Sequence, residues 1–418
     1  MQSKSTPSSA VTNHSLLVAG IVIGVGFLAT TLAQPRVLLH IPLQNLLKNV
    51  LHTDRSTNAA FFFWVGLPWY IKPLIGVLSD AFPILGRRRK SYILIGAVAS
   101  VAAWVSLIGA TNSYSELLTI CMVANLATVI ASTALGGYMV EVAHATSGAG
   151  RLSSLRNLAM QFSYLVAGPA GGSLATLALS WTALACGAVS FLVVPVAWWL
   201  VREPYRQPAR SGVLQSVGQQ LRAMVHARAL WAAALVAALF FVAPGLGTTL
   251  FYLQQNTLHV STEGQGYLAF LSSGAGMLAA AAYGFYGARR FRLRTLLLAC
   301  LLFNAFVTLG YLFYDSYVHA QAIEVINGAG TALGEVVVMH LAVRATPAGS
   351  EALGFAVLMA VRNLFMWGGD WLGSALIESA HVHFDALVYI NAGTTLLAAL
   401  LALVLPKALV DARDSAGS

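Results

Sequence analysis

The chain has 418 residues, of which 58% are hydrophobic and only 9% are charged. Soluble proteins carry about 25% charged residues, so this composition excludes a soluble globular protein and indicates a chain embedded in a lipid bilayer. The formal net charge of +9 does not indicate a nucleic-acid partner, because the cations are confined to short loops on one side of the predicted topology.

Twelve apolar segments have the length of a membrane span, about 20 residues each. Backbone polar groups in lipid must be satisfied within their own segment, so we expect every one of these segments to be helical. The first is interrupted by Pro35, Arg36 and Pro42, and 39–53 is either its bent outer end or an interfacial helix. The expected spans are 15–38, 57–80, 91–111, 115–142, 152–175, 178–201, 229–254, 264–288, 293–314, 318–343, 351–377 and 385–406.

Lysine and arginine residues concentrate in alternate loops and in both tails. These segments hold most of the 24 Lys and Arg, whereas the loops between them hold only Arg36, Lys48 and Arg55. Basic loops stay on the cytoplasmic side of a membrane. We therefore expect a multi-pass protein of the cell (inner) membrane with both termini in the cytoplasm.

A long basic segment after the sixth span divides the chain into two halves of six spans. Its residues 211–226 predict an amphipathic helix on the membrane surface. The fold class is thus an all-α polytopic membrane protein with two pseudo-symmetric six-helix bundles, which is the layout of the major facilitator fold. The expected domains are a disordered cytoplasmic amino tail (1–14), the first bundle (15–201), the linker (202–228), the second bundle (229–406) and a cytoplasmic carboxyl tail (407–418).

The loop between the second and third spans carries a glycine, an acid and a basic run. It reads Gly76-Val-Leu-Ser-Asp80 and then Gly86-Arg87-Arg88-Arg89, after Pro68-Trp69 and Lys72-Pro73. A second segment, Pro347-Ala-Gly349-Ser-Glu351-Ala352, precedes span eleven. The loop resembles the loop signature of the major facilitator superfamily, and its long spacing between the acid and the second glycine, like the second segment, is similar to that of the folate–biopterin transporter family.

This resemblance implies a secondary carrier that moves a folate- or pteridine-like anion by alternating access together with a proton, without a cofactor. One departure concerns span four, where the family carries aspartates ahead of the acid that corresponds to Glu141. This chain has Ser132, Thr133 and Gly136 there. The alternative is therefore a major facilitator carrier or exporter of a different small organic solute.

Charged side chains inside the predicted spans are candidates for substrate binding, because a charge at bilayer depth costs about 2.5–3.5 kcal/mol on the translocon scale. Arg362 can bind an anionic group through its planar guanidinium, and Asn363 adds a donor and an acceptor beside it. The alternative for Arg362 is a structural pair with Glu335, and a pair that substrate breaks would serve both purposes. Lys72 is either a second substrate cation or part of a structural pair.

Glu335 and Asp370 are the expected proton-coupling residues, in that order. Glu335 lies among small residues that permit close helix approach. A carboxyl group in apolar surroundings can gain and lose a proton, since its charged form is poorly solvated there.

Aromatic side chains on three spans are candidates for stacking against a flat heteroaromatic ring. We select Trp69, Tyr252 and Trp367 for this role, against the alternative that they are packing or lipid-interface residues.

A group of charged residues near the inner membrane surface predicts a cytoplasmic gate. Pairs of this kind hold one conformation of a carrier and break in the other. In this group we expect Glu141 to pair with Arg151 or Arg156. The group consists of Asp80, Arg87, Arg88, Arg89, Glu141, Arg151 and Arg156.

Other classes of function have weaker support. A membrane enzyme would need a reactive cluster, and the dense candidate of His381, His383 and Asp385 lacks a further partner nearby. The three cysteines lie in separate apolar runs, which favours buried thiols over disulfides or a metal site. A non-transporting assembly factor on the same fold remains an alternative. By analogy with the fold we expect a monomer.

Overall fold

The computed structural model of the chain describes residues 9–111, 113–146, 149–203, 218–219, 222, 225–243, 245–345 and 351–410. Most of the expected amino tail, of the linker helix 211–226 and of the carboxyl tail therefore lies outside the described residues.

Each expected span falls on helix in the structure. The helices of the first half are α1 (Ser9–Leu32), α2 (His40–Asn49), α3 (Arg55–Val65), α4 (Leu67–Tyr70), α5 (Lys72–Ala81), α6 (Lys90–Ile108), α7 (Tyr114–Thr146), α8 (Ala149–Leu174), α9 (Leu179–Phe191) and α10 (Val193–Leu200). Those of the second half are α12 (Arg228–Val242), α13 (Gly247–Asn256), α14 (Thr262–Ala282), the π-helical turn η1 (Tyr283–Gly287), α15 (Ala288–Arg290), α16 (Leu293–Thr308), the 3₁₀ turn η2 (Leu309–Phe313), α17 (Tyr317–Ala345), α18 (Glu351–Glu378), α19 (Phe384–Val404) and α20 (Lys407–Val410).

Within the described part of the chain, 8 helical stretches are long and apolar enough to cross a membrane. They correspond to expected spans three, four, six, seven, eight, nine, ten and twelve. The remaining four expected spans fall on α1, on the broken run α3–α5, on α8 and on α18. The protein is thus a multi-pass membrane protein, and twelve crossings remain a prediction.

The second span is not one continuous helix. It is divided at Gly66 and at Ile71 into α3, α4 and α5, and a proline occupies the first turn of both later pieces, Pro68 in α4 and Pro73 in α5. Proline has no backbone N–H and its ring clashes with the preceding turn, so it is tolerated at the start of a helix and not within it. These two prolines therefore fix where the span breaks.

The interrupted first span also divides into two helices. α1 ends at Leu32, and α2 begins at His40 after a turn. Most of α2 is buried, including Leu43, Gln44 and Leu47, so it packs within the bundle. This burial fits a bent outer end of the first span and excludes a helix resting on the membrane surface.

The apolar interior divides between the two halves of the chain. Two buried clusters consist of residues between Ala19 and Val201, and three others consist of residues between Leu230 and Val410. A single small cluster of described residues joins the halves, through Ile41 of α2 and Phe251 and Tyr252 of α13. The halves therefore pack mainly within themselves.

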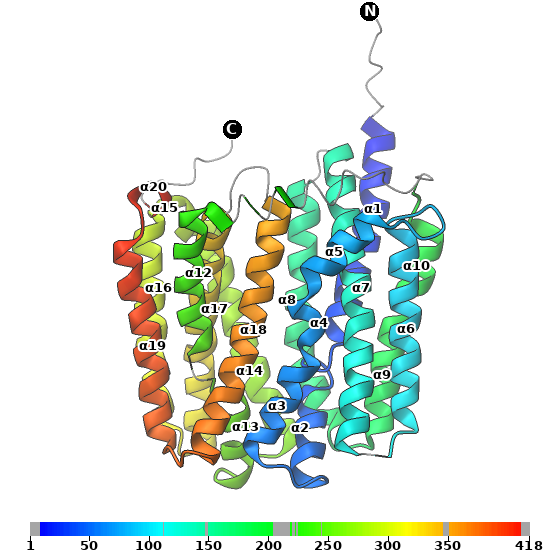
Figure 1. The fold of residues 1–418 in the computed structure, drawn as a ribbon. Helices are drawn as coiled ribbons and strands as arrows, with labels where there is room; N and C mark the ends of the chain where they lie inside the picture. Colours follow the sequence, from blue (N-terminus) through cyan, green and yellow to red (C-terminus); the bar gives the residue numbers. More distant parts are fainter. Residues whose placement is uncertain are drawn as a thin grey trace, which may run out of the picture.

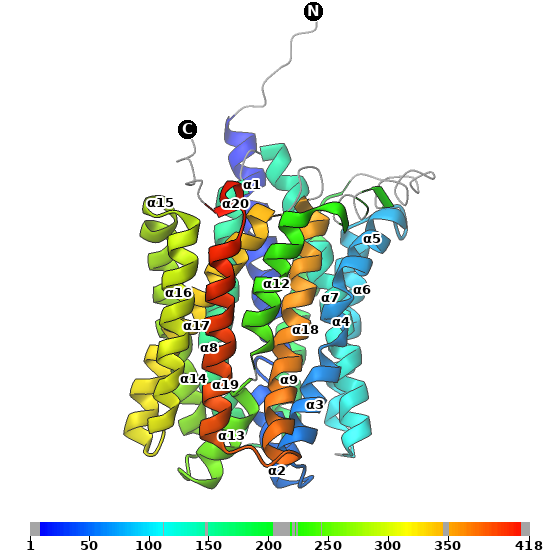
Figure 2. The ribbon, with the colours of Figure 1, turned by 60° about the vertical axis from the view of Figure 1, so that its left-hand side comes forward.

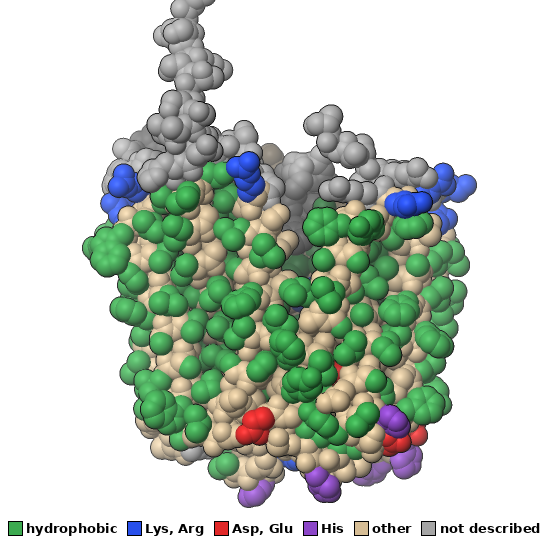
Figure 3. All heavy atoms as spheres, turned by 180° about the vertical axis from the view of Figure 1, so that it is seen from behind, with side chains coloured by type: hydrophobic (Ala, Val, Ile, Leu, Met, Phe, Trp, Pro, Cys, Tyr) green, Lys and Arg blue, Asp and Glu red, His purple; other side chains and the backbone are tan. Residues whose placement is uncertain are grey.

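Long helices run side by side between two ends of the molecule (Figures 1 and 2). We call the end at which α1 begins and α20 lies the terminal end, and the end at which α2 and α13 lie the far end. Lys and Arg side chains gather at the terminal end of the face in Figure 3, whereas acidic and His side chains gather at its far end.

Candidate functional site

Polar contacts join the two halves at the far end. The Tyr252 hydroxyl of α13 donates to the backbone oxygen of Thr53 at 2.8 Å, and the cations Lys48 and Arg55 lie over its ring at 5.1 and 5.5 Å. Lys48 also donates to Gln255 at 2.7 Å. Tyr252 therefore belongs to the contacts that join the two halves at the far end, and it does not contact Lys72 or Arg362.

An ion pair between the halves lies deeper from the same end. Arg36 Nη2, in the turn between α1 and α2, lies 3.0 Å from Asp370 Oδ2 on α18. Asp370 also accepts from the backbone N–H of Thr248 at 2.9 Å and from the Thr248 hydroxyl at 2.8 Å. Thr248 is the second residue of α13, so the carboxylate satisfies a free N–H at the positive end of that helix. We call Arg36, Thr248 and Asp370 the far-end latch.

Aromatic side chains of α18 fill the break in the second span. A Cβ on Gly66 would lie 1.5 Å from the Trp367 ring, so only glycine leaves room for this indole. The Trp367 ring also packs against Tyr70 with centroids 5.6 Å apart, and the Arg36 guanidinium lies over it at 4.8 Å. The break in α3–α5 thus receives a side chain from the other half.

Helices α8 and α14 meet backbone to backbone. A Cβ on Gly168 would lie 2.6 Å from the Gly266 carbonyl oxygen, and a Cβ on Gly266 would lie 2.4 Å from that of Gly168. Small residues permit such close approach of helices in membranes. This glycine contact is a further place where the halves touch.

Nearer the terminal end, a second ion pair lies within the second half. Arg362 of α18 pairs with Glu335 of α17, donates to Asn363 Oδ1 at 2.9 Å and lies over the Phe241 ring at 5.4 Å. The Glu335 side chain is 36% exposed although it lies well inside α17. The pairing that we expected as one alternative for Arg362 is therefore present, and its carboxylate stays accessible.

The first half supplies two cations within its helices, Lys72 in α5 and Arg156 in α8. Lys72 donates to the Ser132 hydroxyl at 3.3 Å and lies over the Trp69 ring at 4.6 Å, and the Trp69 indole donates to Asn125 at 3.0 Å. Arg156 of α8 lies over the Phe27 ring at 4.9 Å. Among the residues that the structure describes, neither Lys72 nor Arg156 has a carboxylate partner.

Tyr164 of α8 has charged neighbours from both halves. The residue is 42% exposed, and it lies close enough to Arg156 and to the Arg362–Glu335 pair of the other half to interact with them electrostatically. The molecular surface is hollowed between the halves towards the terminal end (Figure 3).

The expected gate residues form a network within the first half. Glu141 of α7 pairs with Arg88 and Arg89 at 3.1 and 3.0 Å, in place of the expected Arg151 or Arg156. Arg87 and Arg151 are exposed. The side chain of Asp80 lies outside the described part of the chain.

Three contributing residues were not selected from the sequence. Glu203 accepts from the backbone N–H groups of Arg88, Arg89 and Lys90 at 2.9, 2.9 and 3.0 Å, so it caps the start of α6. In the sequence, Glu203 is recognisable as an acidic residue among cations at the end of span six. Arg36 was visible as a charge in a proline-interrupted span, whereas nothing in the sequence pointed to Thr248.

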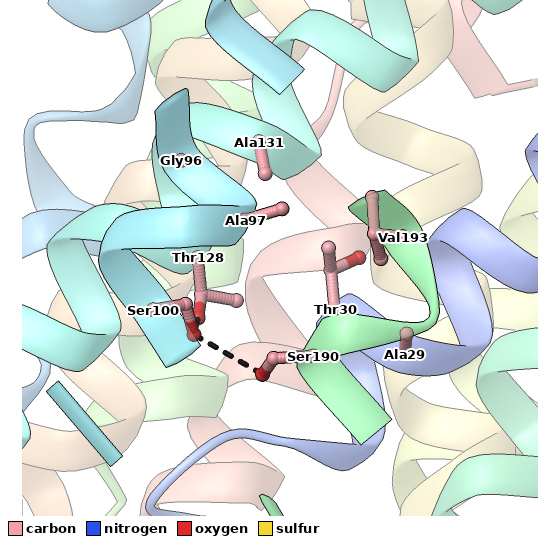
Figure 4. A pocket seen from close by; sticks show the side chains of 9 residues that line it. All are labelled: Ala29, Thr30, Gly96, Ala97, Ser100, Thr128, Ala131, Ser190 and Val193. Carbon is pink, nitrogen blue, oxygen red and sulfur yellow. Dashed lines mark hydrogen bonds between the residues drawn. The ribbon is translucent and has the colours of Figure 1, made fainter. Parts of the chain in front are cut away.

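A small cavity lies inside the first half and holds about one water molecule. The Ser100 hydroxyl lies 3.3 Å from that of Thr128 and 3.2 Å from that of Ser190, and these side chains line the cavity (Figure 4). This cavity is too small for an organic solute, and neither Lys72 nor Arg362 lines it.

Comparisons with known proteins agree with this architecture. The chain is 25% identical over 381 residues to the folate-biopterin transporter of Synechocystis, covering 84% of this chain and 75% of that protein. It is 33% identical over 139 residues to probable folate-biopterin transporter 4 of Arabidopsis thaliana, covering 32% and 28% of the two chains.

Solved structures of transporters share the fold. A single-residue mutant of the nucleoside transporter NupG superposes with a TM-score of 0.73 at 11% identity, covering 93% of this chain and 99% of that one. The D-xylose–proton symporter gives a TM-score of 0.70 at 17% identity, covering 94% and 97%. Residues 35–418 match the BT1 family. The protein is therefore a membrane transporter with the major facilitator fold, and it belongs to the BT1 family.

Proposed function

We propose that the protein is a secondary active transporter that moves a folate- or pteridine-like organic anion by alternating access, coupled to protons. The observation that carries this proposal is the Arg362–Glu335 pair, which lies at membrane depth with an accessible carboxylate. The names of the relatives suggest the substrate class, since one is named a folate-biopterin transporter and the other a probable folate-biopterin transporter.

We assign anion binding to two cations that lie inside the predicted spans, Arg362 and Lys72. Arg362 and Lys72 attract the negative groups of the substrate, and Asn363 orients the Arg362 guanidinium. Trp69 lies directly beside Lys72 and offers a ring face. Trp367 has a buried indole N–H without a partner among the described residues, which can donate to a bound solute. Because Tyr252 contacts Thr53 at the far end, we now assign it to closure.

Proton coupling follows from competition for Arg362. An anionic substrate that binds this guanidinium displaces Glu335, and the released carboxyl group then takes up a proton because it is no longer neutralised. Asp370 is the second candidate, since its protonation would weaken the ion pair with Arg36. Both groups lose a charge partner when the carrier changes state.

Alternating access is supported by where the polar contacts between the halves lie. Among the described residues, the ion pair and hydrogen bonds between the halves gather towards the far end, with the Trp367 ring packed at the Gly66 break deeper between them. We therefore assign the opening of the solute site to the terminal end. The Lys and Arg at the terminal end support a cytoplasmic location for it, with both termini inside. The network of Glu141 with Arg88 and Arg89 would then be released or rearranged when that end closes.

A second candidate function is transport of a different organic solute or export. The observation that favours it is the contact between Lys72 and Ser132, because a hydroxyl stands in the region where the family carries aspartates. A monomer in the cell (inner) membrane suffices for both candidates, since each half contributes to one central site.

The test is binding followed by transport. Purified protein is heated with folate, reduced folate, biopterin, a nucleoside or a sugar acid, and a ligand at a hundredfold excess over its Kd stabilises the folded state by about 2.7 kcal/mol. Stabilisation by pteridines alone supports the proposal, and stabilisation by the unrelated solutes alone supports the second candidate.

Proton coupling is tested in proteoliposomes with Glu335→Gln, and with Glu378→Gln as an exposed acidic control at the end of α18. We expect Glu335→Gln to abolish proton-driven uptake while substrate exchange persists, and the control to behave as wild type. Wild-type uptake by Glu335→Gln at equal abundance would exclude this residue from coupling.

A further inference from the structure

Glu324 is a buried acid of the second half that has no cation beside it among the described residues. It lies in α17, about 10 Å from the start of that helix by the helical rise, and is 8% exposed. Its Oε1 accepts a hydrogen bond from the Tyr314 hydroxyl at 3.1 Å. Two other acids inside the spans, Glu335 and Asp370, have arginine partners instead. The carboxyl group of Glu324 is therefore held by neutral donors.

The surroundings of this carboxyl group add no charge in the described part of the chain. Tyr311 of the turn η2 and the Ser272 hydroxyl of α14 also lie beside it. The charged groups that precede it on the chain, Asp315 and His319, pair with each other and are exposed at the start of α17. Tyrosine and serine hydroxyls stay neutral at and below neutral pH. Glu324 is thus the member of this cluster that can change charge.

A chain of hydrogen bonds leads from this carboxyl group to the other half. Gln254 Nε2 of α13 donates to the Tyr314 hydroxyl at 2.8 Å, and Gln265 Nε2 of α14 donates to Gln254 Oε1 at 3.1 Å. Gln255 Nε2 donates to Gln265 Oε1 at 3.2 Å, and Lys48 Nζ of α2 donates to Gln255 Oε1 at 2.7 Å. We call this chain the far-end relay. It consists of Lys48, Gln255, Gln265, Gln254, Tyr314 and Glu324.

Every hydrogen bond of the far-end relay points the same way. The Lys48 ammonium stands at the donating end and the Glu324 carboxylate at the accepting end, and each side chain between them accepts on one side and donates on the other. Hydrogen bonds arranged head to tail polarise one another, and a bond to a charged group is about twice as strong as a neutral one. The charge on Glu324 therefore strengthens the Lys48–Gln255 contact, which joins the halves.

We propose that Glu324 is a proton-coupling residue that controls closure of the far end through the far-end relay. A proton from water that binds this carboxylate removes the charge at the accepting end, so the contact of Lys48 with Gln255 weakens. Separation of Lys48 from Gln255 in turn removes the cation that polarises the chain, so Glu324 gains a proton more readily. This inference deepens the proposed proton-coupled transport and rests on it for its role in the cycle.

The experiment measures how often the far end opens, in purified protein without substrate. Gln44 of α2 is 2% exposed and lies 3.5 Å from the Thr248 hydroxyl of α13, so a cysteine in its place is shielded while the halves touch. The rate at which Gln44→Cys reacts with a polar thiol reagent is divided by the rate of Ser379→Cys. Position Ser379 is exposed at the same end, so the ratio cancels the pH dependence of the thiol itself.

The relative rate is measured between about pH 8 and pH 5, where folded proteins are generally stable. Glu324→Gln keeps the shape of the side chain and removes its charge, and Tyr314→Phe removes the neighbouring link of the relay. The matched control is Glu263→Gln, which neutralises an exposed acid at the start of α14. All three are introduced into both cysteine backgrounds.

We expect the relative rate to rise as the pH falls when the relay is intact. Glu324→Gln should react at every pH as the intact relay does in acid, about fivefold faster than the intact relay at the alkaline end, because a charge-assisted hydrogen bond becomes a neutral one. Tyr314→Phe should have the same effect, and the double variant should add nothing, since both act on one chain. Glu263→Gln should follow the intact relay.

Three results would overturn the inference. The first is a relative rate that does not depend on pH when the relay is intact. The second is a pH response that survives in both Glu324→Gln and Tyr314→Phe, because it then belongs to another group, such as Asp370 of the far-end latch. The third is a control variant, Glu263→Gln, that behaves like Glu324→Gln, because the response then reports surface charge in general.

The absence of substrate separates this inference from the proposed function. If the relative rate depends on Glu324 but no pteridine binds or is taken up, the relay stands and the proposed substrate is refuted. If pteridine uptake is driven by protons while the relative rate is indifferent to Glu324, proton-coupled transport stands and the relay is refuted.

Discussion

Replacing Asp370 by asparagine should open the far end of the transporter. The substitution preserves the shape of the side chain and leaves an oxygen for the Thr248 N–H, but it removes the charge opposite Arg36. The Arg36 guanidinium is then held between the Trp367 ring and a neutral amide, with its side chain 16% exposed. The variant therefore tests one ion pair with little change in packing.

The expected magnitude follows from the burial of that pair. Removing one partner of a buried ion pair costs about 3–5 kcal/mol, because the other charge remains desolvated. We use about 3 kcal/mol, since Arg36 keeps some exposure and its cation–π contact. This free energy changes the ratio of far-end-closed to far-end-open molecules by about a hundredfold. A carrier that is closed at the far end in a ratio of about 99:1 would become closed and open in about equal amounts.

Cross-linking across the far end reports this ratio. Asn45 and Gln255 belong to different halves and lie 3.4 Å apart between side-chain atoms, so cysteines at both positions form a bridgeable pair in the closed state. The native cysteines are buried and should react slowly. We expect the rate of cross-linking by a short bifunctional thiol reagent to fall about twofold in Asp370→Asn, in proportion to the closed population.

A double variant supplies the control for this reasoning. Arg36→Met combined with Asp370→Asn removes both charges, so no buried cation remains unpaired and cross-linking should recover towards wild type. Wild-type cross-linking in the single variant, or a double variant no better than the single one, would refute the latch.

Two further substitutions test neighbouring features. Gly66→Ala places a methyl group where the Trp367 ring lies, so we expect lost transport and weaker far-end cross-linking, and unchanged cross-linking would contradict the packing described. Glu203→Gln weakens three hydrogen bonds to the backbone of residues 88–90, so thermal unfolding in detergent should show a loss of about 1–3 kcal/mol, and an unchanged melting temperature would argue against this cap.

Composition and loop motifs are sufficient to predict the fold, because both depend on local sequence. Apolar segments of spanning length can only be helical in lipid, and the loop from Gly76 to Arg89 already resembles the family that the comparisons confirm. The breaks in the second span were harder to predict from the sequence. Pro68 and Pro73 indicate them, but the apolar run continues through both, so a single span 57–80 was predicted.

The partners of charged residues depend on contacts between distant segments. Arg36 and Asp370 are 334 residues apart, and their meeting requires the two halves to close at one end. The Arg362–Glu335 pair was among the predicted alternatives because adjacent spans carry both residues. The contact between Lys72 and Ser132 depends on how α5 and α7 are rotated about their own axes, which the order of residues does not reveal.

The glycine contact between α8 and α14 determines how easily the halves can move. Helices that pack through long side chains interlock as ridges in grooves, and turning one against the other forces side chains over each other. At Gly168 and Gly266 the touching surfaces are main chain and the Ala269 methyl, so the two helices can roll there with no rotamer to change. Resistance to rocking is then concentrated in the far-end polar contacts and in the packing of Trp367 at Gly66. The speed of the cycle is consequently adjustable by substitutions at those contacts and not at the two glycines.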